Sequence, residues 1–170
     1  MSCWKNKLTV ENSFNMVELL AAEYWNTFHA TLSPLSQYYG KPYILERFGD
    51  TLQMADELGQ LVLSGIKTAT SSSLWAWEAE GTLLPQPGLI SIILDGKDQP
   101  ICIIETMEVY VCRFNKIEEE FARDEGEGDL SLAYWREAHK KFFTRQLAKI
   151  EKEFSEEMPL VCERFRVIFK

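Results

Sequence analysis

The sequence predicts an α+β domain, with helices flanking a small, mainly antiparallel β-sheet or barrel. The strand-like segments cluster along the chain instead of alternating one for one with helices, which argues against a parallel α/β sheet. The chain has 170 residues, of which 46% are hydrophobic and 12% aromatic. This length and composition suit a single domain with one continuous core.

Three long helices are predicted from apolar residues that recur at intervals of three and four. The first covers residues 15–31. The second begins at the N-cap candidate Asp50 and ends at Gly65, a residue type that favours a left-handed C-cap. The third runs from about Leu130 to Phe154, and a short helix is predicted at residues 73–81.

The strand predictions rest on β-branched and apolar runs. Residues 89–96 and 100–114 flank the turn D-G-K-D-Q-P and predict an antiparallel pair. Residues 66–73 suit a short strand or an ordered loop, and residues 159–169 are expected to close the sheet. Residues 33–43 mix Pro, Gly, Ser and aromatic residues without a period, which indicates a loop.

Composition excludes several classes of protein. The net charge of −8 argues against a polybasic nucleic-acid coat and against an anchor on a membrane surface. No apolar run approaches the length of a membrane span, and no secretory signal is present, so a cytoplasmic protein is expected. Four cysteines without a close pair and two distant histidines predict neither a disulfide framework nor a zinc site. No metal or other cofactor is therefore expected.

Two polar features of the sequence are candidates for a functional site. Lys67, Thr70 and the run of serines 71–73 follow a predicted helix end, and Glu105 interrupts an apolar strand. A carboxylate in such surroundings is expected to be paired or to have a raised pKa, with Lys67 as a candidate partner. The alternatives remain a purely structural buried ion pair, an outward-facing Glu105, or a solvated Lys67 at the negative end of the preceding helix.

Charge is distributed unevenly along the C-terminal half. Residues 115–129 carry a net charge of −5, whereas residues 136–152 carry +4. The basic side chains either contact a nucleic-acid backbone or form the solvent face of an amphipathic helix. They are Lys141, Arg145, Lys149 and Lys152. His139 lies on the apolar stripe of the same helix, which predicts a packed core imidazole.

Three sequence blocks resemble the ASCH domain family, which is related to the PUA domains. The blocks are FGDTLQMADELGQLVLSGIKTATSSS, GLISIILDGKDQPICIIETMEV and EFARDEGEGDLSLAYWREAH, and the resemblance covers about residues 46–169. It implies a PUA-like β-barrel flanked by helices. Residues 1–170 are then one ASCH domain, with residues 1–40 as an N-terminal helical extension.

The family signature is similar to G-x-K-x-x-T-x-R and falls on Gly65, Lys67 and Thr70, with Ser72 where the pattern has Arg. Family members have been assigned to RNA binding, to ribonuclease activity and to amide hydrolysis of N4-acylated cytidine by a Lys, Thr and Glu set. When that set is carried over to this sequence, the resemblance implies catalytic roles for Lys67, Thr70 and Glu105. It implies ligand contacts for Gly65, Ser71 and Ser72.

The predicted function is recognition of RNA or a nucleoside-type ligand in a pocket around Lys67, Thr70 and Glu105. The alternative is a metal-independent hydrolase, either an amidohydrolase or a ribonuclease, in which Lys67 with a lowered pKa acts as base or nucleophile. The expected partner is single-stranded RNA or a modified nucleoside. No membrane is expected as a partner. Binding that coats duplex DNA along its length is not expected either.

Overall fold

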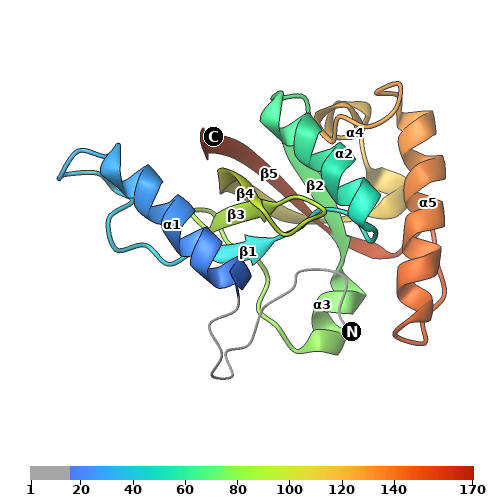
Figure 1. Ribbon diagram of the computed structural model, residues 1–170. Coiled ribbons are helices and arrows are strands. Elements are labelled where there is room, and N and C mark those ends of the chain that lie inside the picture. Colours follow the sequence, from blue (N-terminus) through green and yellow to red (C-terminus); the bar gives the residue numbers. More distant parts are fainter. Residues whose placement is uncertain (1–15) are drawn as a thin grey trace. The chain divides into compact units, whose positions relative to one another are not determined.

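A computed structural model of the chain describes residues 16–170. Within this range there are five α-helices, a short 3-10 helix and five strands (Figure 1). The helices are α1 (Met16–Ala30), α2 (Leu52–Leu63), α3 (Leu74–Glu80), α4 (Glu119–Asp124) and α5 (Leu132–Ala148), and the 3-10 helix is η1 (Phe114–Lys116). The strands are β1 (Ile44–Glu46), β2 (Ala69–Ser73), β3 (Ile90–Leu94), β4 (Pro100–Arg113) and β5 (Pro159–Phe169).

The strands form one mixed five-stranded sheet in the order β1-β3-β4-β5-β2. The β3–β4 and β2–β5 pairs are antiparallel, and the β1–β3 pair is parallel. The predicted α+β class is therefore confirmed, as is the antiparallel pair around the D-G-K-D-Q-P turn. Strand β1 was missed by the sequence analysis because three residues are too few to show a period.

The chain divides into two compact units through which β4 and β5 both run. The first unit comprises the residues up to Leu63, together with Gly88–Glu105 and Val167–Lys170. The second comprises Ser64–Pro87 and Thr106–Arg166.

In the first unit, the inner face of α1 packs on the isoleucine-rich strand β3. Figure 1 shows α1 beside β1 and β3. The buried cluster consists of Ala21, Trp25, Phe28, Ile90, Ile92, Leu94 and Ile103. The Tyr24 hydroxyl adds a hydrogen bond of 3.0 Å to the carbonyl oxygen of Ile101. Helix α1 thus shares its hydrophobic core with the sheet, although it precedes the region of the family resemblance.

In the second unit, α5 is shorter than predicted. It begins at the N-cap Ser131, whose hydroxyl accepts the Tyr134 N–H. It ends at Ala148 instead of near Phe154, because Glu151 adopts a left-handed φ of 57°. The Lys152 N–H then bonds the carbonyl oxygen of Leu147 at 3.0 Å, which closes the last turn.

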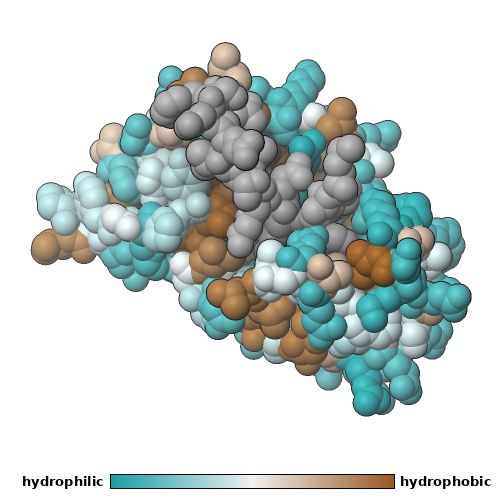
Figure 2. Space-filling view, turned by 90° about the horizontal axis from the view of Figure 1, so that it is seen from below, coloured by the Kyte–Doolittle hydropathy of each residue, from teal (hydrophilic) through white to brown (hydrophobic). Residues whose placement is uncertain are grey.

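Hydrophilic residues dominate the surface in Figure 2, with separate groups of hydrophobic residues among them. Among the described residues, no helix has the length and apolar character needed to cross a membrane. Cys102 and Cys162 are buried free thiols and Cys112 is half-buried, while Cys3 lies outside the described residues.

Candidate functional site

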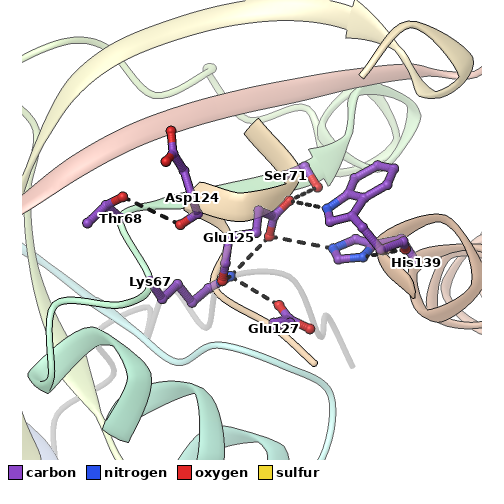
Figure 3. A network of polar contacts seen from close by, with 8 residues as sticks. Lys67, Thr68, Ser71, Asp124, Glu125, Glu127 and His139 are labelled. Carbon is purple, nitrogen blue, oxygen red and sulfur yellow. Dashed lines mark hydrogen bonds and ion pairs between the residues drawn. The ribbon is translucent and has the colours of Figure 1, made fainter. Parts of the chain in front are cut away.

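A buried cluster of charged side chains surrounds Lys67, which lies between α2 and β2. Its ammonium is 3.0 Å from a carboxylate oxygen of Glu125 and 3.1 Å from one of Glu127. A third hydrogen bond, of 3.2 Å, goes to the carbonyl oxygen of Glu125 (Figure 3). An ammonium has three N–H donors, and all three of these oxygen atoms lie within hydrogen-bonding distance of it.

Glu125 is the centre of this cluster, which we call the Lys67–Glu125 network. Besides Lys67, the carboxylate accepts hydrogen bonds from the Ser71 hydroxyl at 2.7 Å and from the Trp135 indole N–H at 3.0 Å. The Lys67 and Glu125 side chains are each only 1% exposed, whereas that of Glu127 is 19% exposed. Buried charges with this many partners form one cooperative unit.

The network shifts the pKa values of its two most buried members in opposite directions. Burial alone lowers the pKa of Lys67, but the combined attraction and hydrogen bonds of Glu125 and Glu127 outweigh it, so this pKa is raised. Burial likewise raises the pKa of Glu125, but Lys67 and His139 outweigh that effect and hold it well below its usual range. Lys67 is therefore an ammonium and Glu125 a carboxylate at neutral pH.

His139, on α5, contacts the same carboxylate. Its ring stacks on that of Trp135 with a centroid separation of 4.2 Å. The Nδ1 atom lies 3.0 Å from the carbonyl oxygen of Trp135, and since a carbonyl only accepts, Nδ1 is the donor. The Nε2 atom then faces a Glu125 oxygen at 3.5 Å. The predicted core imidazole is thus buried as expected, and it also completes the network.

The geometry of the network also resembles a metal site. Glu125, Glu127 and His139 each present a ligand atom, and these atoms lie within 4.8 Å of one another. The Lys67 ammonium, however, already binds both carboxylates. A divalent cation would have to compete with this internal positive charge.

Backbone contacts fasten the loop after α4 to the start of β2. The Thr68 N–H donates to the carbonyl oxygen of Asp124 at 2.7 Å, and the Asp124 carboxylate pairs with Arg164 of β5. Gly126 has a φ of +77°, and a Cβ there would lie 2.9 Å from backbone atoms of Ile66 and Lys67. Only glycine fits this close approach.

The other signature residues on β2 have different surroundings. Thr70 is half-buried, and its register partner on β5 is the buried Glu163. Within residues 16–170, the Thr70 side chain has no hydrogen-bond partner. Ser72 accepts the indole N–H of Trp77 at 2.8 Å, so the residue at the Arg position of the signature anchors α3. Gly65 has a left-handed φ of +76°, as the predicted C-cap requires.

Glu105 belongs to the first unit and has its own partners there. Its carboxylate is buried, accepts the Tyr38 hydroxyl at 3.0 Å, and has the Lys41 ammonium 3.8 Å away. The sequence predicts a cation at this carboxylate, with Lys67 as a candidate. Lys41 provides a cation at Glu105, while the ammonium of Lys67 is engaged by Glu125 and Glu127.

The basic side chains of α5 and the following turn are exposed. Lys141 pairs with Glu137 one helical turn away, and Arg145 lies 6.0 Å from the ring centroid of Phe142. Lys152 lies 5.0 Å from a ring centroid of Trp75. These contacts fit the interpretation as the solvent face of an amphipathic helix.

Sequence reasoning missed Glu125, Glu127, Tyr38 and Lys41 as polar partners of the candidate residues. The two glutamates lie among seven acidic residues in 115–129, and their only distinguishing signal is the adjoining pair of glycines. Tyr38 and Lys41 lie in residues 33–43, for which the sequence predicts only a loop. No local pattern marks a side chain that pairs with a residue about 60 positions away.

Comparison with known proteins identifies close structural relatives. A family model described as ASCH domain matches residues 45–169. The solved ASCH domain from Lactobacillus crispatus JV V101 has 33% identity and a TM-score of 0.83, over 92% of this chain and 99% of that one. A protein from Enterococcus faecalis V583 has 39% identity and a TM-score of 0.74, over 90% and 88% of the two chains. A search of the curated proteins found no match.

Proposed function

Since the chain belongs to the ASCH domain family, we propose that it recognises a nucleoside or a short single-stranded RNA element. The observation that carries this proposal is Thr70, a half-buried signature residue whose hydroxyl has no partner among the described residues. A hydroxyl can donate to and accept from a ligand at once, which suits the edge of a nucleobase. Its β2 neighbours are held rigidly by the Lys67–Glu125 network and by Trp77.

The charge of the network favours a nucleoside over a phosphate as the recognised group. One ammonium faces two carboxylates, so the network carries no excess positive charge even when His139 is protonated. Because Ser72 stands where the family signature has Arg, this chain also lacks the guanidinium that would bind a phosphate in bidentate fashion at that position. Recognition through the base and sugar is therefore the better supported mode.

The same network argues against Lys67 as a catalytic base. A base or nucleophile must be the neutral amine, whereas Glu125 and Glu127 raise the pKa of Lys67 and occupy its N–H donors. Amide or phosphodiester hydrolysis would require this lysine to lose those contacts when the substrate binds. Hydrolase activity is retained as the alternative that the assays below detect.

Binding is tested by calorimetry with cytidine and N4-acetylcytidine, and by fluorescence anisotropy with labelled pentacytidine, pentaadenosine and pentauridine RNA. We expect at least one probe to bind, and Thr70→Val to weaken it about tenfold, as the loss of one good hydrogen bond does. The control is Thr144→Val, which alters a hydroxyl on the exposed face of α5. The proposal fails if the wild-type chain binds none of these probes at about 1 mM.

Two further measurements separate the remaining alternatives. Since few phosphates are expected to be engaged, the logarithm of the association constant for a pentanucleotide should fall with the logarithm of the salt concentration, with a slope of about 1 or less.

Incubation with N4-acetylcytidine or RNA, followed by chromatography, detects cytidine or shortened RNA. If either product forms in the wild type and not in Lys67→Met, the hydrolase alternative replaces simple recognition.

A further inference from the structure

We infer that the outer edge of β4, which we define as residues 106–113, pairs with the same edge of a second copy of this chain. The whole edge belongs to the second unit. The pairing of β4 with β3 ends at Glu105, the register partner of Ile90. Strand β3 does not extend further in this direction, because the chain before it turns at Gly88, which has a φ of +87°. Within residues 16–170, the edge therefore has no neighbouring strand on the side of β3.

The other side of β4 is paired with β5 in one antiparallel register. The Phe114 N–H donates to the carbonyl oxygen of Met158 at 2.9 Å. Farther along the two strands, the Arg164 Nε lies 3.4 Å from a carboxylate oxygen of Glu108. Both contacts fit the same register, without a bulge between them. In this register, the backbone groups of the even-numbered residues of β4 bond to β5.

The backbone groups that point to the open side are those of Met107, Val109 and Val111. Consecutive residues of a strand direct their N–H and C=O groups to opposite sides, so these odd-numbered residues turn theirs away from β5. Within the described part of the chain, none of these groups has a hydrogen-bond partner on that side. An unpaired strand edge of this kind is a template for the addition of a further strand.

The side chains of the same three residues form an exposed apolar stripe. Met107 is 47% exposed and Val111 51%, and the half-buried Val109 lies between them. Since the three residues are spaced by two, they share one face of β4. Natural edges are commonly protected from pairing by Lys or Pro, and residues 106–113 contain neither. Their one Glu and one Arg also leave the edge without net charge, although the whole chain carries −8.

A second copy fits this edge because the edge is self-complementary in the antiparallel orientation. With a two-fold axis at Val109, Met107 of each copy faces Val111 of the other, and the two Val109 residues face each other. All paired positions are then odd-numbered, so outward N–H groups meet outward C=O groups. Glu108 faces Tyr110 of the second copy, which opposes no like charges. Such an arrangement is closed and gives a dimer and no larger assembly.

Sedimentation velocity of the full chain tests the dimer. At about 0.15 M salt, the wild type should show a monomer–dimer equilibrium, with a dissociation constant of about 10–100 µM because a single strand edge is a small interface. Val109→Pro removes an outward N–H and no bond to β5, and Val111→Lys places a charge in the apolar stripe. Each should weaken dimerisation at least about tenfold.

The matched control is Leu83→Lys, which introduces the same charge at a residue of the second unit that is 90% exposed and lies outside β4. This variant should dimerise like the wild type. Circular dichroism and thermal unfolding verify that each variant is folded. Because the Val111 side chain is half-exposed in the monomer, Val111→Lys keeps the test decisive even if Val109→Pro does not fold.

Hydrogen exchange identifies the surface that the dimer uses. The amides of Met107, Val109 and Val111 should become protected as the protein concentration rises, and Val111→Lys should lose this protection. The inference is overturned if the wild type stays monomeric at about 500 µM, if assemblies larger than a dimer form, or if a dimer leaves these amides unprotected. Protection in the monomer would also overturn it, since another part of the same chain would then cover the edge. Nucleoside binding is measured separately, so failure here leaves the proposed function standing.

Discussion

The Lys67 ammonium lies 3.0 Å from a Glu125 carboxylate oxygen, and each of these side chains is only 1% exposed. Removing two charges from water is costly, and only their mutual attraction and further hydrogen bonds compensate for that cost. Here Glu127, Ser71, Trp135 and His139 supply the additional contacts. The pair joins the start of β2 to the loop between α4 and α5, so its integrity should control both stability and the shape of the candidate site.

Glu125→Gln should destabilise the fold by about 3 kcal/mol, because it removes one of the two carboxylates that pair with the buried Lys67 charge. Urea unfolding followed by circular dichroism measures this change. The matched control is Glu137→Gln, which breaks a pair on α5 whose members, Lys141 and Glu137, are 67% and 72% exposed. That change should cost at most about 0.5 kcal/mol. Equal effects of the two substitutions would contradict the role assigned to the Lys67–Glu125 network.

Stability should depend on pH through the same pair. The folded pKa of Glu125 is below its unfolded value of about 4.3, so its contribution is complete above that pH and is lost as the pH falls further. The folded pKa of Lys67 is raised, so its contribution is complete below about pH 10.4 and is lost as the pH rises through the folded pKa.

The measurement is the free energy of unfolding in urea as a function of pH. Between about pH 5 and pH 2, the wild type should lose stability more steeply than Glu125→Gln, which cannot titrate at that position. Lys67→Met should likewise lack part of the wild-type loss above about pH 10. Parallel curves for the wild type and both variants would rule out this linkage.

Gly126→Ala should be more destabilising than Gly65→Ala, although both glycines have left-handed φ angles of +77° and +76°. A Cβ at Gly65 meets nothing within 4 Å, so only the backbone cost of about 1 kcal/mol applies. A Cβ at Gly126 would lie 2.9 Å from the backbone at Ile66 and Lys67, which adds about 1–3 kcal/mol of overpacking. Urea unfolding of both variants checks the difference, and equal losses would show that the loop tolerates displacement.

Lys67→Ala should convert the network into a binding site for a divalent cation. Without the ammonium, the two carboxylates and the His139 ring retain ligand atoms within 4.8 Å of one another. Since Nδ1 donates to Trp135, Nε2 is available as the ligand atom. Zinc at about 0.1 mM should raise the Tm of the variant by several degrees and leave that of the wild type unchanged. An equal response of both proteins, or no response in the variant, would refute this expectation.

Local patterns in the sequence were sufficient for most elements of the fold. The three long helices, the short helix α3 and the β3–β4 pair were predicted because each has its own period or turn signal. The end of α5 was placed too late, because the left-handed Glu151 has no distinctive residue type. Strand β1 was missed because only its parallel pairing with β3 identifies it.

The candidate site was predicted only in part. Lys67, Thr70 and Glu105 were singled out by residue type, by their positions and by the family signature. The printed sequence could not identify Glu125 among the other acidic residues of its segment, nor Tyr38 within a loop. Both side chains matter because of contacts across 58 and 67 residues of chain, respectively.

The sequence by itself therefore determined the α+β class, the family and which charged residues lie among apolar ones. Only the tertiary structure decided which opposite charges meet, and hence that Lys67 is a protonated ammonium paired with Glu125 and Glu127. The physical reason is that hydrophobic period and turn chemistry are local properties, whereas the pKa of a buried group depends on charges that folding brings within a few ångströms. For Lys67, the sequence leaves open a role as a base, whereas the structure shows an ammonium that links the start of β2 to Glu125 and Glu127.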